Sequence, residues 1–244
     1  EVLILAGDIA TEPQIFDEVM AEMQHVPAAL KLFVAGNHDV WVHPRDTKDS
    51  AARFEQLSAA CARFGIHDLA RGARLLDGIA FVGTIGWYDY SFRVEAHGLS
   101  LKQYERKRYG GQQWYDRTYV RWGSDDVTIA RRCEEALRQQ IASVRDEARA
   151  IVAVTHCVPF RDAVHYKGQL IWDFYCAFMG SAGLGEILRA EPKVTRACFG
   201  HTHLPYRGRI GEIEAVCSPV GYLEDRPLDL AALARERIAI IETD

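Results

Sequence analysis

The 244-residue sequence lacks any apolar run near the ~18 residues that a helix needs to cross a bilayer, so we expect no membrane partner. It also lacks an excess of positive charge. The 29 basic and 34 acidic residues leave a net charge of −5, which does not attract nucleic acid or an anionic membrane. The six cysteines include no Cys-x-x-Cys pair and are too sparse for a secreted disulfide framework. We therefore expect reduced thiols and a cytoplasmic protein.

Asparagine is also scarce, since it occurs only at Asn37. In other respects the composition is ordinary, with 48% hydrophobic and 26% charged residues, as in a soluble globular protein. The sequence has no internal repeat, no low-complexity tract and no linker that would separate two domains. The length is sufficient for a substantial core, so we expect a single domain over residues 1–244.

The first part of the chain alternates short apolar runs with amphipathic segments. Residues 2–6 and 32–35 are apolar and are each followed by glycine, which is typical of strands buried on both faces. A proline near its start and apolar residues at helical spacing predict a helix over residues 13–23, and the same spacing predicts another over residues 50–64. This alternation predicts a layered α/β fold.

The later segments continue the pattern. An Asp-Gly turn predicts a hairpin over residues 75–82, and a long amphipathic helix is predicted over residues 124–148. Further predicted elements are strands over residues 151–154 and 197–199, a hairpin over 209–216, and a last strand over 238–241.

Residues 86–123 differ from the rest because they combine many aromatic and basic residues with little periodicity. One interpretation is a surface on which aromatic rings stack a nucleobase while cations hold its phosphate. The other is a cap insert whose aromatic residues pack in a small core of their own. Acidic residues dilute the positive charge of this segment, which does not favour nucleic acid as a partner.

Polar clusters follow four of the predicted strands. They are Gly7-Asp8, Gly36-Asn37-His38-Asp39, Thr155-His156 and Gly200-His201-Thr202-His203. Each cluster alone is compatible with a turn or a structural histidine. Ligands of α/β proteins, however, bind beyond the carboxyl ends of strands, where these side chains would converge. Carboxylate, amide and imidazole groups suit Mn, Fe, Zn, Ni or Co, and a set without thiolates suits a catalytic site.

These four clusters, in this order, resemble signature blocks of the calcineurin-like metallophosphoesterases, a superfamily of binuclear phosphatases and phosphodiesterases. The resemblance spans nearly the whole chain. It implies a four-layer α/β/β/α sandwich of two mixed β-sheets flanked by helices, with the aromatic and basic insert as a cap. It also implies two divalent metal ions, and hydrolysis of phosphate mono- or diesters by a metal-bound hydroxide.

The resemblance implies a role for each residue of the site. Asp8 would bridge the two metals, and His203 would belong to the first. Asn37, His156 and His201 would complete the second metal site. His38 would hydrogen-bond the phosphoryl oxygen or protonate the leaving group, and Asp39 would orient His38.

One block of the family pattern, an Asp-x-His triplet before Asp8, is not present in this sequence. We expect either that residues upstream of this sequence supply it or that the first metal site is incomplete. The expected substrate is a small phosphoester such as a nucleotide. Two alternatives stay open: a nuclease acting on single-stranded nucleic acid, and a non-catalytic scaffold that retains the fold.

Overall fold

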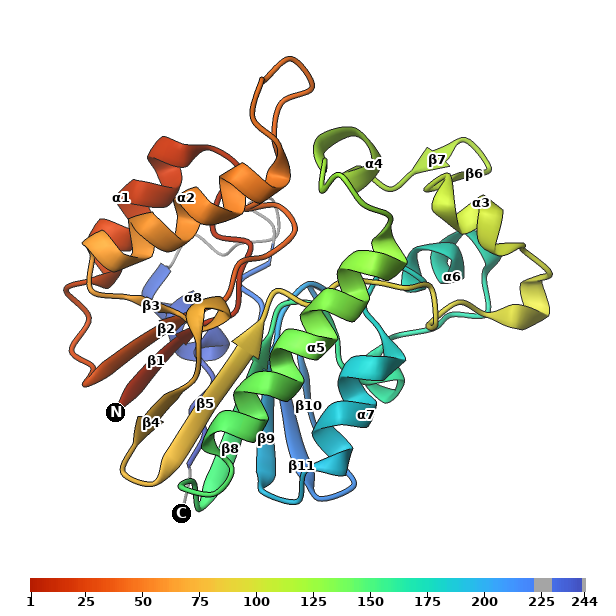
Figure 1. Cartoon of the computed structure of the whole chain (residues 1–244). Helices are drawn as coiled ribbons and strands as arrows, with labels where there is room; N and C mark the ends of the chain where they lie inside the picture. Colours follow the sequence, from red (N-terminus) through yellow and green to blue (C-terminus); the bar gives the residue numbers. More distant parts are fainter. Residues whose placement is uncertain (222–229, 243–244) are drawn as a thin grey trace.

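The structure, a computed structural model, describes residues 1–221 and 230–242. Two main β-sheets face each other (Figure 1). The smaller sheet is parallel and has the order β1-β2-β3, formed by β1 (Val2–Leu5), β2 (Leu30–Phe33) and β3 (His67–Asp68). The larger sheet has the order β10-β11-β9-β8-β5-β4, formed by β4 (Arg74–Leu76), β5 (Ile79–Thr84), β8 (Ala150–Thr155), β9 (Val194–Phe199), β10 (Tyr206–Ile210) and β11 (Ile213–Cys217).

The larger sheet is mixed, as predicted, but the smaller sheet, also predicted to be mixed, is parallel throughout its described strands. The four inner strands of the larger sheet are parallel to one another, and the edge strands β4 and β10 pair antiparallel with β5 and β11. Parallel inner strands bring the loops after β8 and β9 to the same edge of the sheet. This arrangement places the polar clusters of the second half of the chain side by side.

Three clusters of buried hydrophobic residues fill the space between the layers. Strand β5 contributes alternate residues to two of these clusters. Phe81 faces the smaller sheet, where it shares a cluster with Leu32. Val82 faces the opposite way and packs with Leu137, a residue of the long helix α5 (Asp126–Val144). This alternation is the two-residue period of a strand with both faces covered. The flanking helices are α1 (Pro13–Met23) and α2 (Ser50–Arg63) on the smaller sheet, and α5 (Asp126–Val144) and α7 (Ala182–Ala190) on the larger. The predicted α/β/β/α order is confirmed.

Two predicted strands differ from the structure. All residues of β1 are partly exposed rather than buried, because among the described strands β1 is the outer one of its sheet and pairs only with β2. No strand forms over residues 238–241, which follow α8 (Leu230–Arg237) without regular structure. Arg207 and Arg196 donate to the carbonyls of Ile240 and Glu242, so side chains rather than a strand ladder hold this segment.

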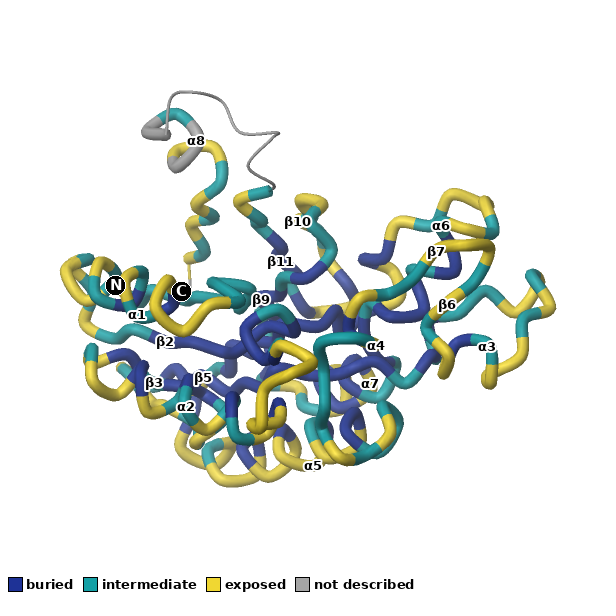
Figure 2. Tube along the Cα trace, turned by 90° about the horizontal axis from the view of Figure 1, so that it is seen from above, coloured by how far each residue is buried: buried dark blue, intermediate teal, exposed yellow. Residues whose placement is uncertain are grey.

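Residues 86–123 lie between β5 and α5 in the chain and extend to one side of the molecule (Figure 2). They contain α3 (Leu101–Glu105), the short strands β6 (Arg108–Tyr109) and β7 (Gln112–Gln113), and α4 (Asp116–Tyr119), with α6 (Leu170–Cys176) close by. Five of the ten aromatic residues of this segment are almost completely buried, namely Trp87, Tyr88, Tyr90, Phe92 and Tyr104, whereas Trp114 and Trp122 are partly exposed and Tyr115 is exposed. This burial favours a packed core over a surface for stacking nucleobases.

All six cysteines are free. Among the described residues, no helix is long and apolar enough to cross a membrane.

Candidate metal centre

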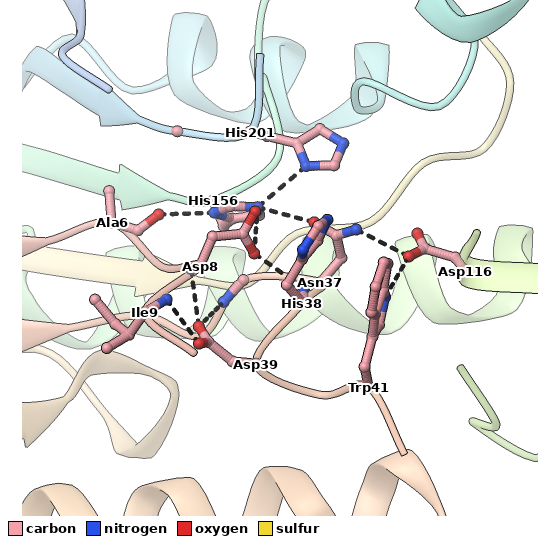
Figure 3. A network of polar contacts seen from close by, with 12 residues as sticks. Ala6, Asp8, Ile9, Asn37, His38, Asp39, Trp41, Asp116, His156 and His201 are labelled. Carbon is pink, nitrogen blue, oxygen red and sulfur yellow. Dashed lines mark hydrogen bonds and ion pairs between the residues drawn. The ribbon is translucent and has the colours of Figure 1, made fainter. Parts of the chain in front are cut away.

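Four of the five predicted ligands meet where the two sheets adjoin (Figure 3). Asp8 and Asn37 follow β1 and β2 of the smaller sheet, whereas His156 and His201 follow β8 and β9 of the larger one. Asn37 and His156 are completely buried, and His201 is nearly so. The site is therefore built at the carboxyl ends of strands, and these strands come from both sheets.

The side chains of Asp8, Asn37 and His201 converge on the ring of His156. Its Nε2 atom lies 3.1 Å from Asn37 Oδ1, 3.1 Å from His201 Nδ1 and 3.3 Å from Asp8 Oδ1. The possible ligand atoms of Asp8, His156 and His201 all lie within 4.8 Å of one another. One ion could contact all of them, since metal–ligand distances of about 2.0–2.2 Å are usual for these groups.

For three of these side chains, a hydrogen bond on the outer side fixes which atom faces the centre of the site. His156 Nδ1 donates to the Ala6 carbonyl at 2.8 Å, and His201 Nε2 donates to the Phe178 carbonyl at 3.1 Å. Asn37 Nδ2 donates to Asp116 Oδ1 at 2.8 Å. The inward atoms are thus lone-pair acceptors, and acceptors that face one another repel unless a cation or proton lies between them. This donor set fits a divalent metal ion.

The charges of the site follow from the same contacts, and Asp8 raises the pKa of His156 against the effect of burial. Burial raises the pKa of Asp8, but His156, His38 and His201 outweigh burial and hold the pKa below its ordinary value. Burial and the neighbouring His156 lower the pKa of His201 to about 3, so this imidazole is neutral at neutral pH, as a metal ligand must be.

Close backbone approach explains two glycines at the site. Gly7 has φ +86°, and a Cβ atom there would lie 2.5 Å from the Gly36 amide nitrogen. A Cβ atom on Gly36 would lie 2.1 Å from Asp8 Oδ1. Both distances are shorter than atoms tolerate, so a side chain at either position would displace the Asp8 carboxylate or its loop.

Asp39 is placed differently from the orienting role expected for it. Its completely buried carboxylate accepts backbone N–H groups from Asp8 and Gly36 at 2.9 and 2.8 Å, and from Ile9 and Ala10 at 2.7 and 2.9 Å. Among the described residues, no hydrogen bond joins Asp39 to His38. Burial and the nearby Asp8 raise the pKa of Asp39 to about 6. Asp39 fastens the two ligand-bearing loops together instead.

The His38 ring is held by stacking. Its centroid lies 4.0 Å from that of Trp41 at an interplanar angle of 19°, while the His38 backbone N–H donates to Asp8 Oδ1 at 2.9 Å. His38 is partly exposed. His203 is not part of the group formed by Asp8, His156 and His201. Burial lowers its pKa, and Asp8 and His38 are close enough to influence it.

Sequence analysis missed Asp116 and Trp41. Asp116 lies 79 residues after Asn37, in the insert, and only the folded chain shows that their side chains meet. A single acidic residue among aromatic ones gives no signal at the level of sequence. Trp41 lies three residues after His38, but its stacking on that ring likewise depends on the local turn.

A two-sheet α/β fold with carboxylate, amide and imidazole groups gathered at the strand ends is characteristic of a metal-dependent enzyme. Residues 1–205 match the family model of the calcineurin-like phosphoesterases, and the chain belongs to this family, whose members hydrolyse phosphoesters with divalent metals. No curated protein gives a significant match.

Among solved structures, the chain is similar to phosphopantetheinyl hydrolase from Mycobacterium tuberculosis, with 21% identity and a TM-score of 0.71 over 93% of this chain and 83% of that one. It is more distantly similar to a dimetal phosphatase from Danio rerio, with 9% identity and a TM-score of 0.47 over 89% and 86% of the two chains. The first similarity supports the fold.

Proposed function

We propose that this protein hydrolyses small phosphate mono- or diesters, such as a nucleotide, at a divalent metal centre. The observation that carries the proposal is the convergence of Asp8, Asn37, His156 and His201, each with an acceptor atom facing the others. Family membership supplies the class of reaction.

These four residues would hold one ion, and Asp8 with His203 would contribute to a second, giving the binuclear centre that the family resemblance implies. Divalent ions bound there would stabilise negative charge on the phosphoryl oxygens and lower the pKa of a coordinated water. The protein's own part is to present neutral imidazoles and oriented oxygens, which its outer hydrogen bonds to Ala6, Phe178 and Asp116 achieve.

His38 is the candidate for proton transfer. Its partly exposed ring is fixed on Trp41 and lies beside the ligand Asn37 in the chain. An imidazole in this position would hydrogen-bond a phosphoryl oxygen or give a proton to the leaving oxygen. Asp39 would act as a positioning residue for the loops that carry Asp8 and Asn37.

A cavity of about 390 Å³ lies beside the segment that follows His203. It is bordered by Leu204 and Tyr206 of that segment and by Trp172, whose ring centroid lies 3.2 Å from the Lys167 ammonium. We further propose that residues 1–244 act as one domain with residues 86–123 as its cap, and that the free cysteines suit the cytoplasm.

The two alternatives are less well supported. A nuclease would need exposed aromatic rings along the insert, but five of the ten aromatic residues there are almost completely buried and four are partly buried, which leaves Tyr115 as the exposed one. A non-catalytic scaffold would not need the aligned acceptors or the partly exposed His38.

Hydrolysis of bis-p-nitrophenyl phosphate and p-nitrophenyl phosphate tests the proposal. The wild-type protein should lose activity on chelation and regain it with Mn²⁺, and the ratio of the two rates gives the mono- or diesterase preference. Single-stranded oligonucleotides serve as a third substrate. Cleavage of oligonucleotides alone would favour the nuclease, and no hydrolysis at any Mn²⁺ concentration would favour the scaffold.

A further inference from the structure

One carboxylate in the insert accepts four side-chain hydrogen bonds. Asp116, only 1% exposed, stands at the first position of α4. Its Oδ1 atom accepts from Asn37 Nδ2 at 2.8 Å and Trp41 Nε1 at 2.7 Å. Its Oδ2 atom accepts from Trp114 Nε1 at 2.8 Å and the Tyr88 hydroxyl at 3.1 Å. Both oxygens are therefore fully used by donors.

The two bonds to Oδ1 lead directly to the metal centre (Figure 3). Asn37 turns its own Oδ1 atom toward His156 Nε2, and Trp41 stacks on the His38 ring. An asparagine side chain has two ends of nearly the same shape, one an acceptor and the other a donor. An ionised carboxylate accepts only, so it selects the orientation in which the Asn37 amide nitrogen points to Asp116 and the oxygen points to the metal site.

We propose that Asp116 is a positioning residue that fixes the ligand atom of Asn37 and, through Trp41, the ring of His38. The insert is then a working part of the metal centre and not only a cover over it. This inference rests on the proposed function, because it assigns Asp116 to the same site.

The first test compares Mn²⁺ affinity in the wild type, Asp116→Ala and Tyr88→Phe. Asp116→Ala frees the Asn37 amide to turn, so we expect the Kd for Mn²⁺ to rise about 10–100-fold, as is usual when a partner of a metal ligand is removed. Tyr88→Phe removes one bond to the same carboxylate without touching Asn37 or Trp41, and its Kd should stay within about twofold of wild type. A merely structural role would destabilise both variants and leave both affinities unchanged.

A second test needs no variant, because Asn37 is the only asparagine of the chain. Labelling with ¹⁵N-asparagine gives a single side-chain amide in the NMR spectrum. In the wild-type protein its protons should exchange slowly with water, since a buried carboxylate holds them. Exchange as fast as in a free amide would overturn the inference. Because this measurement uses the wild-type protein, it tests the inference even if Asp116→Ala does not fold.

The possible outcomes distinguish a failure of the positioning role from a failure of the proposed function. A wild-type protein that binds Mn²⁺ while Asp116→Ala binds it equally well would overturn the positioning role alone. A wild-type protein that binds no Mn²⁺ would overturn the proposed function and the positioning role with it.

Discussion

At the scale of single residues, the side chains that would bind a metal ion differ in burial from the one that would act on a substrate. Asn37 is completely buried with both ends of its amide engaged, whereas His38, the next residue, keeps a partly exposed ring. Neighbouring residues in one turn therefore face different partners. This difference gives opposite expectations for their substitution.

Asn37→Ala should lose metal, and His38→Ala should lose turnover. Removing the amide oxygen takes away one ligand, so metal content measured by elemental analysis should fall first in Asn37→Ala. His38→Ala should keep its metal while kcat drops about 10²–10⁴-fold, the usual contribution of a general acid or base. A metal-replete Asn37→Ala protein, or equal metal loss in His38→Ala, would contradict these assignments.

Asp39→Ala should be strongly destabilising. It would leave four backbone N–H groups in the ligand-bearing loops without their acceptor. At about 1 kcal/mol or more for each, the free energy of unfolding should fall by about 4 kcal/mol, measured by urea denaturation. Asp46→Ala is the matched control, since Asp46 accepts one backbone N–H, from His43, in an exposed loop. A similar small loss in both variants would show that Asp39 does not fasten the loops.

The candidate ligands could be predicted because each lies within four residues of the end of an apolar strand and because the four polar clusters resemble the family's signature blocks. Asp8, Asn37, His156 and His201 meet as expected. The part played by Asp39 could not be predicted, since its partners are backbone amides of two loops that meet only after folding. The role of Asp116 could not be predicted either, because its contacts depend on where the insert packs.

At the scale of elements, the strands and helices followed their apolar patterns except where pairing or polar contacts decided the outcome. β1 has the sequence of an inner strand but stands at an edge. α5 and α7 pack as amphipathic helices, yet a buried polar pair joins them: the Ser181 hydroxyl donates to Glu134 Oε1 at 2.9 Å. Such a pair makes the contact between the helices sensitive to pH.

Relative to wild type, Glu134→Gln should stabilise the folded protein at alkaline pH and should have a smaller effect at acid pH. Burial raises the pKa of Glu134, and the hydroxyl of Ser181 offsets this only in part. The folded state therefore binds the proton more tightly than the unfolded state, so wild-type stability falls as the pH rises through the pKa of Glu134. Glutamine still accepts from Ser181 but cannot ionise.

Thermal denaturation at pH 4 and pH 8 checks this expectation. The Tm of Glu134→Gln should exceed that of wild type at pH 8, and the difference should shrink at pH 4. Glu135→Gln, on the exposed side of the same helix, should give no such pattern. A Tm difference that is the same at both pH values would contradict the assignment.

At the scale of the whole molecule, the metal centre joins parts that are otherwise separate. Its ligands come from both sheets, and the insert contacts it through Asp116 and through Trp114, whose ring lies 5.7 Å from that of His201. The layer order could be predicted from the family resemblance, whereas the alternation of strands and helices predicted only a layered α/β fold. The packing of the insert could not, because its aromatic residues have no period that identifies the buried face.

Metal binding should therefore stabilise the whole fold. At 100 times the Kd, a bound ion contributes about 2.7 kcal/mol, which for a chain of this size raises Tm by about 5–10 °C. Differential scanning calorimetry with and without Mn²⁺ measures the shift. Asn37→Ala should show a much smaller one at the same Mn²⁺ concentration, and an equal shift in both proteins would place the ion elsewhere.

The most direct test of the account is the metal content of the purified protein after exhaustive dialysis without chelator, compared with that of His156→Ala. His156 is the residue on which the other three ligands converge. The account predicts at least one divalent ion per wild-type chain and almost none in a folded His156→Ala protein. A metal-free wild type, or the same metal content in both proteins, would contradict it.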